Sequence, residues 1–151
     1  MKLTWFFLAI LQLVAAPPSW SNSYHYIRPD QLHEKLNSGP SMILIDISPA
    51  AIFAQKHIPG AIGTQAYPVK TTAEKMRLDK MLPLIGASDD TAIIIICPMG
   101  GQSAQRTFDH LKARGVNPNR MKILAGGILA WPYVSQRNQP VEPPPFTPPN
   151  Q

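Results

Sequence analysis

The chain has 151 residues and a formal net charge of +5, and it contains 17 prolines but a single cysteine. One cysteine excludes an internal disulfide, and the scattered lysines and arginines form no arginine-rich or aromatic-interleaved run of the kind that binds nucleic acid. With no second cysteine and no histidine pair at ligand spacing, we expect no metal site, and no motif indicates a cofactor.

The first 21 residues have the features of a secretory signal peptide. Lys2 supplies the positive charge, and Leu3 to Ala16 is apolar apart from Thr4 and Gln12. The run is too short for a transmembrane helix, which needs about 20 residues. We place cleavage near Ser21 and expect an exported protein, periplasmic or secreted, without stable membrane insertion. An uncleaved N-terminal anchor is the alternative.

The rest of the chain alternates short strands with helices and ends in a proline-rich tail. The predicted elements are a strand at 24–27, a helix at 29–36, a strand at 42–47, a helical turn at 50–55, a brief strand near 62, a helix at 72–82, a strand at 92–96, a helix between 103 and 115, a strand at 121–124 and a short helix at 128–131. This alternation predicts an α/β fold, with a central parallel five-stranded sheet and helices on both faces. We assign one domain to residues 22–141 and an extended, disordered tail to residues 142–151.

The one cysteine lies in an informative position. Cys97 follows four consecutive isoleucines, which predict a strand buried on both faces, and it precedes a loop that contains Gly100 and Gly101. Ser103 suits the N-cap of the next helix, and Gly115 suits its end. Between a strand and a helix N-terminus, unpaired amides and the helix dipole favour a thiolate. A buried, unreactive apolar cysteine is the alternative.

Four motifs resemble, in order, those of the rhodanese family of sulfurtransferases. They are Leu44-Ile45-Asp46-Ile47, similar to the family's strand ending in Asp-Val-Arg; Lys56-His57-Ile58-Pro59-Gly60-Ala61, similar to Gly-His-Ile-Pro-Gly-Ala; Cys97 to Ser103, similar to Cys-x-x-Gly-x-Arg-Ser; and Gly126 to Trp131, similar to Gly-Gly-x-x-x-Trp. The resemblance covers residues 26–141 and implies the rhodanese-like fold.

The resemblance also implies a sulfurtransferase that works through a persulfide on Cys97. The sulfur would come from thiosulfate, a polysulfide or a protein persulfide and pass to cyanide or a thiol, so the expected partner is a small sulfur-containing anion or a protein thiol. The backbone amides of the loop would hold the anion; the residues concerned are Met99, Gly100, Gly101, Gln102 and Ser103. We expect a monomer. The alternative is a non-catalytic rhodanese-like binding module in which Cys97 is inert.

The loop departs from the family pattern at Gln102, where many members have arginine. Arginine offers a positively charged fork that suits an oxyanion, whereas glutamine is uncharged. Losing one charge-assisted contact costs about 1.5–3 kcal/mol, which predicts weaker use of thiosulfate. Arg106 lies about one turn into the helix, and we expect it to be solvated rather than to compensate.

Asp46 and His57 are the other polar residues that the motifs single out, and we expect both to support the site structurally. Asp46 ends a strand, where its carboxylate could accept hydrogen bonds from loop amides and brace the pocket. His57 lies in the turn before Ile58 and Pro59, and we interpret it as a hydrogen-bonded structural residue rather than a proton shuttle.

Overall fold

The computed structural model describes residues 23–133. The predicted signal peptide (1–21), the end of the predicted domain (134–141) and the predicted tail (142–151) lie outside the described residues and stay predictions. Within residues 23–133, no helix combines the length and the apolar character that a membrane crossing requires.

Five parallel strands form the central sheet in the order β1-β5-β4-β2-β3. The elements in chain order are β1 (Tyr26–Ile27), α1 (Pro29–Ser38), β2 (Met42–Asp46), α2 (Ala50–Gln55), β3 (Ile62–Gly63), α3 (Thr72–Asp79), α4 (Leu82–Gly86), β4 (Ala92–Ile96), α5 (Gln102–Ala113), the 3-10 turn η1 (Pro118–Arg120), β5 (Met121–Leu124) and the 3-10 turn η2 (Ile128–Ala130). Because all pairs are parallel, the carboxyl ends of the strands meet at one edge, where ligands of open α/β sheets bind.

The central strand β4 is buried on both faces, as its isoleucines predict. Ile93 and Ile95 belong to one apolar cluster, whereas Ile94 and Ile96 belong to the other. All four side chains are at most 1% exposed. Since successive side chains of a strand point to opposite faces, two separate cores sandwich the sheet. The side chain of Cys97 continues the alternation and joins the cluster of Ile93 and Ile95.

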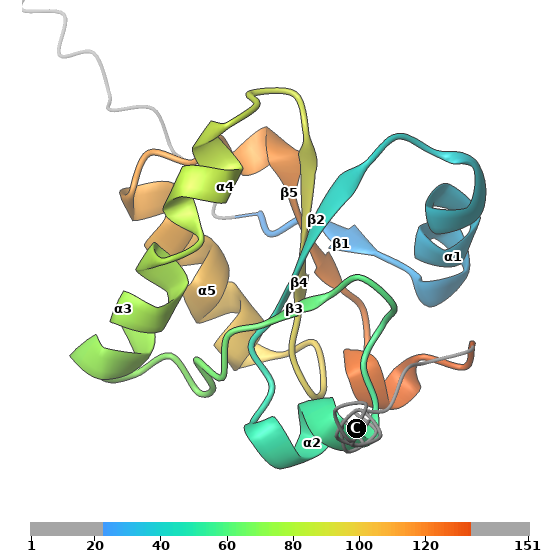
Figure 1. Cartoon of the computed structure of the whole chain (residues 1–151), viewed down its shortest axis with the longest axis horizontal. Coiled ribbons are helices and arrows are strands. Elements are labelled where there is room, and N and C mark those ends of the chain that lie inside the picture. Colours follow the sequence, from blue (N-terminus) through green and yellow to red (C-terminus); the bar gives the residue numbers. More distant parts are fainter. Residues whose placement is uncertain (1–22, 134–151) are drawn as a thin grey trace, which may run out of the picture.

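Helices cover both faces of this sheet. Figure 1 shows α3, α4 and α5 on one side and α1 on the other. Phe108 and Leu111 of α5 pack into the first core, and Leu32 of α1 packs into the second together with Trp131. The α/β fold class, the five-stranded parallel sheet and the helices on both faces are therefore confirmed.

The predicted helix at 72–82 is wrong in one respect, because the segment forms two helices. Thr71 caps α3 through a capping box with Glu74, and this helix ends at Asp79. Pro83 lies in the first turn of α4. A proline has no amide hydrogen, so a continuous helix could not form the hydrogen bond from residue 83 back to the carbonyl of Asp79.

The first strand is shorter than predicted and begins at Tyr26 rather than at Tyr24. The Tyr24 ring packs edge-on against Phe108 at a centroid distance of 5.4 Å, and its hydroxyl donates to Asp109 at 2.8 Å. Both partners lie on α5, so this part of the chain packs on a helix instead of extending the sheet.

An ionic cluster joins α3 to α5 beside the first core. One carboxylate oxygen of Asp79 lies 2.7 Å from His110 Nε2, and the other accepts a hydrogen bond from Arg114 at 2.6 Å. Burial by itself raises the pKa of Asp79. The hydrogen bond with His110 and the charge of Arg114 outweigh this effect and hold the pKa below its usual range.

We predict that Asp79→Asn lowers the free energy of unfolding by about 1–2 kcal/mol at pH 7. A carboxylate whose pKa is lowered by folding stabilises the folded state above its unfolded pKa of about 3.9, and this stabilisation is lost as the pH falls through the folded value. Urea unfolding of both proteins at pH 7 and pH 3 measures the difference, which should shrink at pH 3.

Asp89→Asn is the matched control, because the Asp89 side chain is fully exposed and lies 4.0 Å from Arg120. It should change stability by less than about 0.5 kcal/mol at either pH. An Asp79→Asn difference that is equally large at pH 3 and pH 7 would contradict the electrostatic interpretation.

Candidate active site

The loop that follows β4 is bound on one side to the turn that follows β5. The carbonyl oxygen of Cys97 accepts a hydrogen bond from Ile128 N at 2.9 Å, and that of Pro98 accepts one from Leu129 N at 3.1 Å. In a trans peptide the C=O and N–H bonds point in opposite directions. With the Pro98 carbonyl directed at η2, the Met99 N–H is directed away from η2.

Two glycines make this contact possible. Gly100 has φ +68°, and a Cβ there would lie 2.6 Å from Leu124 O and 2.7 Å from Gly126 N. Gly127 has φ +63°, and a Cβ there would overlap the Cys97 carbonyl oxygen. Both positions also have left-handed backbone geometry, which favours glycine. The Cys97 loop and the Gly126–Gly127 turn therefore interlock through backbone alone.

Helix α5 begins one residue after the N-cap Gly101, so the prediction of Ser103 as its N-cap is wrong. Ser103 lies inside the first turn, where its hydroxyl accepts a hydrogen bond from Arg106 Nη2 at 3.1 Å. Gly101 can take the capping position because glycine is accepted there almost as readily as serine. The Ser103 side chain is 7% exposed.

The Cys97 thiol is almost completely buried and receives one amide. Its residue is 2% exposed, and its Sγ accepts a hydrogen bond from Gly100 N at 3.1 Å. Within residues 23–133, the amides of Met99, Gly101, Gln102 and Ser103 donate to no backbone or side-chain acceptor. The structure thus places one of the five predicted amides on the sulfur and leaves four N–H groups of the same loop and helix N-terminus available.

A cavity of about 450 Å³ opens beside this loop. Its lining contains every loop residue of the predicted site except Gly100, together with four residues that sequence reasoning did not place there. The lining residues are Tyr67, Pro68, Lys70, Cys97, Met99, Gly101, Gln102, Ser103 and Arg106. Two of these nine carry positive charge and none carries negative charge.

Three of the lining residues, Tyr67, Pro68 and Lys70, come from residues 64–71, which contain no helix or strand. The backbone is left-handed at Gln65 (φ 54°) and at Val69 (φ 63°). Such geometry costs on the order of 1–3 kcal/mol in a residue other than glycine. Val69 is 1% exposed, and burying a valine side chain recovers about 1.5–3 kcal/mol. Core packing therefore offsets the strain at this position.

Two arginines hold this segment in place. Arg77 donates to the Gln65 carbonyl at 2.6 Å, and Arg106 Nε donates to the Pro68 carbonyl at 2.9 Å. Arg106 is half-buried and lines the cavity, so the expectation that it is solvated is wrong. Its helical spacing from Gln102 (i, i+4) and Ser103 (i, i+3) is the signal that could have placed it beside the loop.

Asp46 and His57 lie near each other, but neither lines the cavity. Asp46 pairs with Ile96 in the sheet, so its side chain lies on the face opposite that of Cys97. Burial raises the pKa of Asp46, and Ser48 and the charge of His57 partly counteract this. Asp46 Oδ1 accepts a hydrogen bond from Ser48 N at 2.8 Å, and His57 Nδ1 lies 2.8 Å from Phe53 O. Both residues contact backbone on the α2 side of the sheet, and their role as structural support stays a prediction.

Lys56 occupies the position of the first glycine in the Gly-His-Ile-Pro-Gly-Ala pattern, and the structure explains why lysine fits. Its backbone is extended (φ −158°), which any residue adopts. Its Nζ donates to the Trp131 carbonyl at 2.5 Å. The substitution therefore adds a link between the end of α2 and the residue that follows η2.

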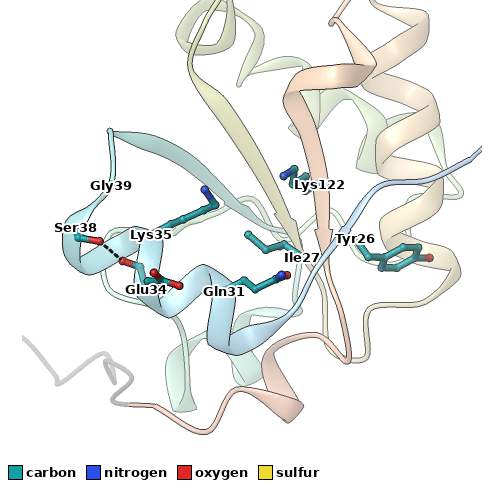
Figure 2. Close-up of a pocket in the computed structure, with 8 residues that line it drawn as sticks. All are labelled: Tyr26, Ile27, Gln31, Glu34, Lys35, Ser38, Gly39 and Lys122. Carbon is teal, nitrogen blue, oxygen red and sulfur yellow. Dashed lines mark hydrogen bonds between the residues drawn. The ribbon is translucent and has the colours of Figure 1, made fainter.

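A second cavity, of about 350 Å³, lies between α1 and the edge of the sheet formed by β1 and β5. Figure 2 shows Gln31, Glu34 and Lys35 of α1 on one side of it and Lys122 of β5 on the other. It contains no residue of the Cys97 loop and no nucleophilic thiol. Within residues 23–133, no group of three or more histidine, cysteine, aspartate or glutamate side chains could hold a metal ion.

A comparison with known protein families identifies the family to which this chain belongs. The family model of the rhodanese-like domain matches residues 28–132. The chain belongs to the rhodanese family. This match includes all the predicted site residues and ends one residue after Trp131. No curated protein sequence matches this rhodanese-like chain.

Solved structures share the fold. A rhodanese-like domain protein from Staphylococcus aureus is 18% identical with a TM-score of 0.54, and the alignment covers 76% of this chain and 99% of that one. A protein from Staphylococcus saprophyticus is 26% identical with a TM-score of 0.50, covering 71% and 92%. A thiosulfate sulfurtransferase from Pseudomonas aeruginosa is 18% identical with a TM-score of 0.56, covering 76% of this chain but only 20% of that protein.

We predict opposite results for alanine at the two neighbouring loop glycines. Gly100→Ala should lower the free energy of unfolding by at least about 2 kcal/mol, because the new Cβ meets backbone atoms and the φ is left-handed. Gly101→Ala is the matched control and should cost less than about 1 kcal/mol, because a Cβ there meets no atom within 4 Å and φ is −99°. Thermal and urea unfolding measure both changes. Equal losses in the two variants would contradict the interlock.

Proposed function

We propose that the chain is a sulfurtransferase that carries sulfane sulfur as a persulfide on Cys97. The observation that supports this most directly is the 3.1 Å hydrogen bond from Gly100 N to Cys97 Sγ in a cavity at the N-terminus of α5. Amide hydrogens and the positive end of a helix dipole favour an anion at that point. The same groups that favour the thiolate also favour the persulfide anion, which carries the same charge.

The proposed cycle has two transfers. A lone pair of the Cys97 thiolate forms a bond to the outer sulfur of thiosulfate or of another sulfane donor. The donor's S–S bond breaks, and its electron pair leaves with the remaining fragment, which is sulfite when the donor is thiosulfate. Cyanide or a thiolate then attacks the terminal sulfur of the persulfide, and the thiolate of Cys97 leaves. No metal, external oxidant or reductant is needed for either step.

A non-catalytic binding module is the second candidate. The 2% exposure of Cys97 favours it, because a thiol that no reagent reaches cannot accept sulfur. The neutral Gln102 in the loop favours it as well. The two candidates differ in the reactivity of one atom, Cys97 Sγ, and this difference can be measured.

We predict that the purified protein gains the mass of one sulfur atom after incubation with thiosulfate or polysulfide, measured on the intact chain. Because Cys97 is the only cysteine, Cys97→Ser removes every thiol and should abolish the gain. Added cyanide should restore the original mass and release one thiocyanate for each persulfide.

Alkylation by iodoacetamide near pH 6 provides an independent measurement. Rapid, stoichiometric labelling of the folded protein is expected for a sulfurtransferase. If neither donor adds sulfur and Cys97 is labelled only after unfolding, the chain is a binding module instead. A mass gain that survives in Cys97→Ser would show adsorbed sulfur rather than a persulfide.

A further inference from the structure

We propose that Arg106 is the specificity-determining residue for oxyanionic sulfur donors, in place of the arginine that the loop lacks at Gln102. The proposal rests on the proposed function and refines its donor class. The guanidinium of Arg106 would bind the sulfonate-like end of a donor such as thiosulfate in the cavity, while its outer sulfur faces Cys97. Lys70, which also lines the cavity, would add a second positive charge from residues 64–71.

The hydrogen bonds of Arg106 leave most of its guanidinium available. Its Nε donates to Pro68 O at 2.9 Å, and one Nη2 hydrogen is used with Ser103 Oγ at 3.1 Å. A guanidinium has five N–H donors. Three therefore remain, and among residues 23–133 no acceptor contacts them. The two existing bonds hold the guanidinium through Nε and Nη2, which lowers the conformational entropy that binding of an anion would have to remove.

The charge of the cavity suits an anion. Arg106 and Lys70 line it together with the N-terminal turn of α5, and no lining residue is acidic. Asp109, three residues after Arg106 on α5, accepts a hydrogen bond from Tyr24 and lines a neighbouring cavity that Arg106 also borders. Within residues 23–133, no hydrogen bond or ion pair joins Asp109 to Arg106. A planar fork binds two oxygens of a sulfonate at once, whereas a polysulfide, although anionic, has no oxygen for the fork to bind.

The contact between Arg106 and the sulfonate group of the donor would also contribute during sulfur transfer. As the S–S bond of thiosulfate breaks, its electron pair moves to the sulfonate sulfur and the leaving group becomes sulfite, which carries two negative charges. Arg106 would stabilise this developing charge. Ser103 would act as a positioning residue, because its hydroxyl accepts a hydrogen bond from Arg106 and its own hydrogen remains free to donate.

The experiment compares two donors in three variants. Arg106→Gln is expected to raise KM for thiosulfate by about tenfold or more. It should slow persulfide formation from inorganic polysulfide much less, by about threefold at most, because polysulfide has charge but no oxygens for the fork. Arg106→Lys should give an intermediate KM, because it keeps the charge but loses the fork. Lys112→Gln removes a positive charge from the same helix outside the cavity lining. It should change neither the KM for thiosulfate nor the rate of persulfide formation from polysulfide.

A measurement on the wild-type protein covers the case in which Arg106→Gln fails to fold. Sulfate should slow alkylation of Cys97 in a saturable manner, and chloride at the same ionic strength should not. The inference is overturned if sulfate gives no saturable protection, or if Arg106→Gln lowers sulfur transfer from thiosulfate and from polysulfide by the same factor. A wild-type protein that accepts sulfur from neither donor yet shows sulfate protection would instead overturn the proposed function and leave the anion site standing.

Discussion

The Cys97 loop depends on a close backbone contact between two turns, each of which has a glycine at the contact. Gly100 and Gly127 both have positive φ, and a Cβ on either would meet backbone atoms of the other turn. This close approach lets the backbone amides of η2 donate hydrogen bonds to the carbonyls of Cys97 and Pro98. Because those carbonyls are satisfied away from the cavity, the loop can present N–H groups to the sulfur without leaving buried acceptors unpaired. The glycine pair after β5 thus shapes a site to which it contributes no side chain.

Sequence reasoning predicted the parts of the fold whose signals are local and strong. Ile93 to Ile96 predicted a strand buried on both faces, and the alternation of strands with helices predicted the parallel sheet. It failed where the outcome depends on packing between distant segments. The segment at 64–71 has no periodicity, so nothing in its residues indicates that Tyr67 and Lys70 line the cavity. The position of Arg106 depends on the Pro68 carbonyl, 38 residues away along the chain.

Gln102 and Arg106 show that a motif compared one position at a time can miss a charged residue that lines the same cavity from the next helical turn. Gln102 is the first residue of α5 and is exposed, whereas Arg106 lies one turn later on the same side and is half-buried. A long side chain on the second turn of a helix extends back toward its N-terminus. The loop has no positive charge at Gln102, but Arg106 of the same helix places one at the same cavity. Arg106 is held in place because it donates hydrogen bonds to both Ser103 and Pro68.

Because Cys97 is buried, a negative charge on its sulfur would need stabilisation from several groups around the cavity. Removing a singly charged ion from water costs several kcal/mol, and one hydrogen bond to an anion contributes about 1.5–3 kcal/mol. The Gly100 amide alone is therefore too little to keep a buried sulfur ionised. The four unpaired amides between Met99 and Ser103, the dipole of the 12-residue helix α5 and the guanidinium of Arg106 all lie around the same cavity. The proposed sulfur transfer therefore requires the loop, the helix N-terminus and the cationic residues of the cavity to act together on a single sulfur atom.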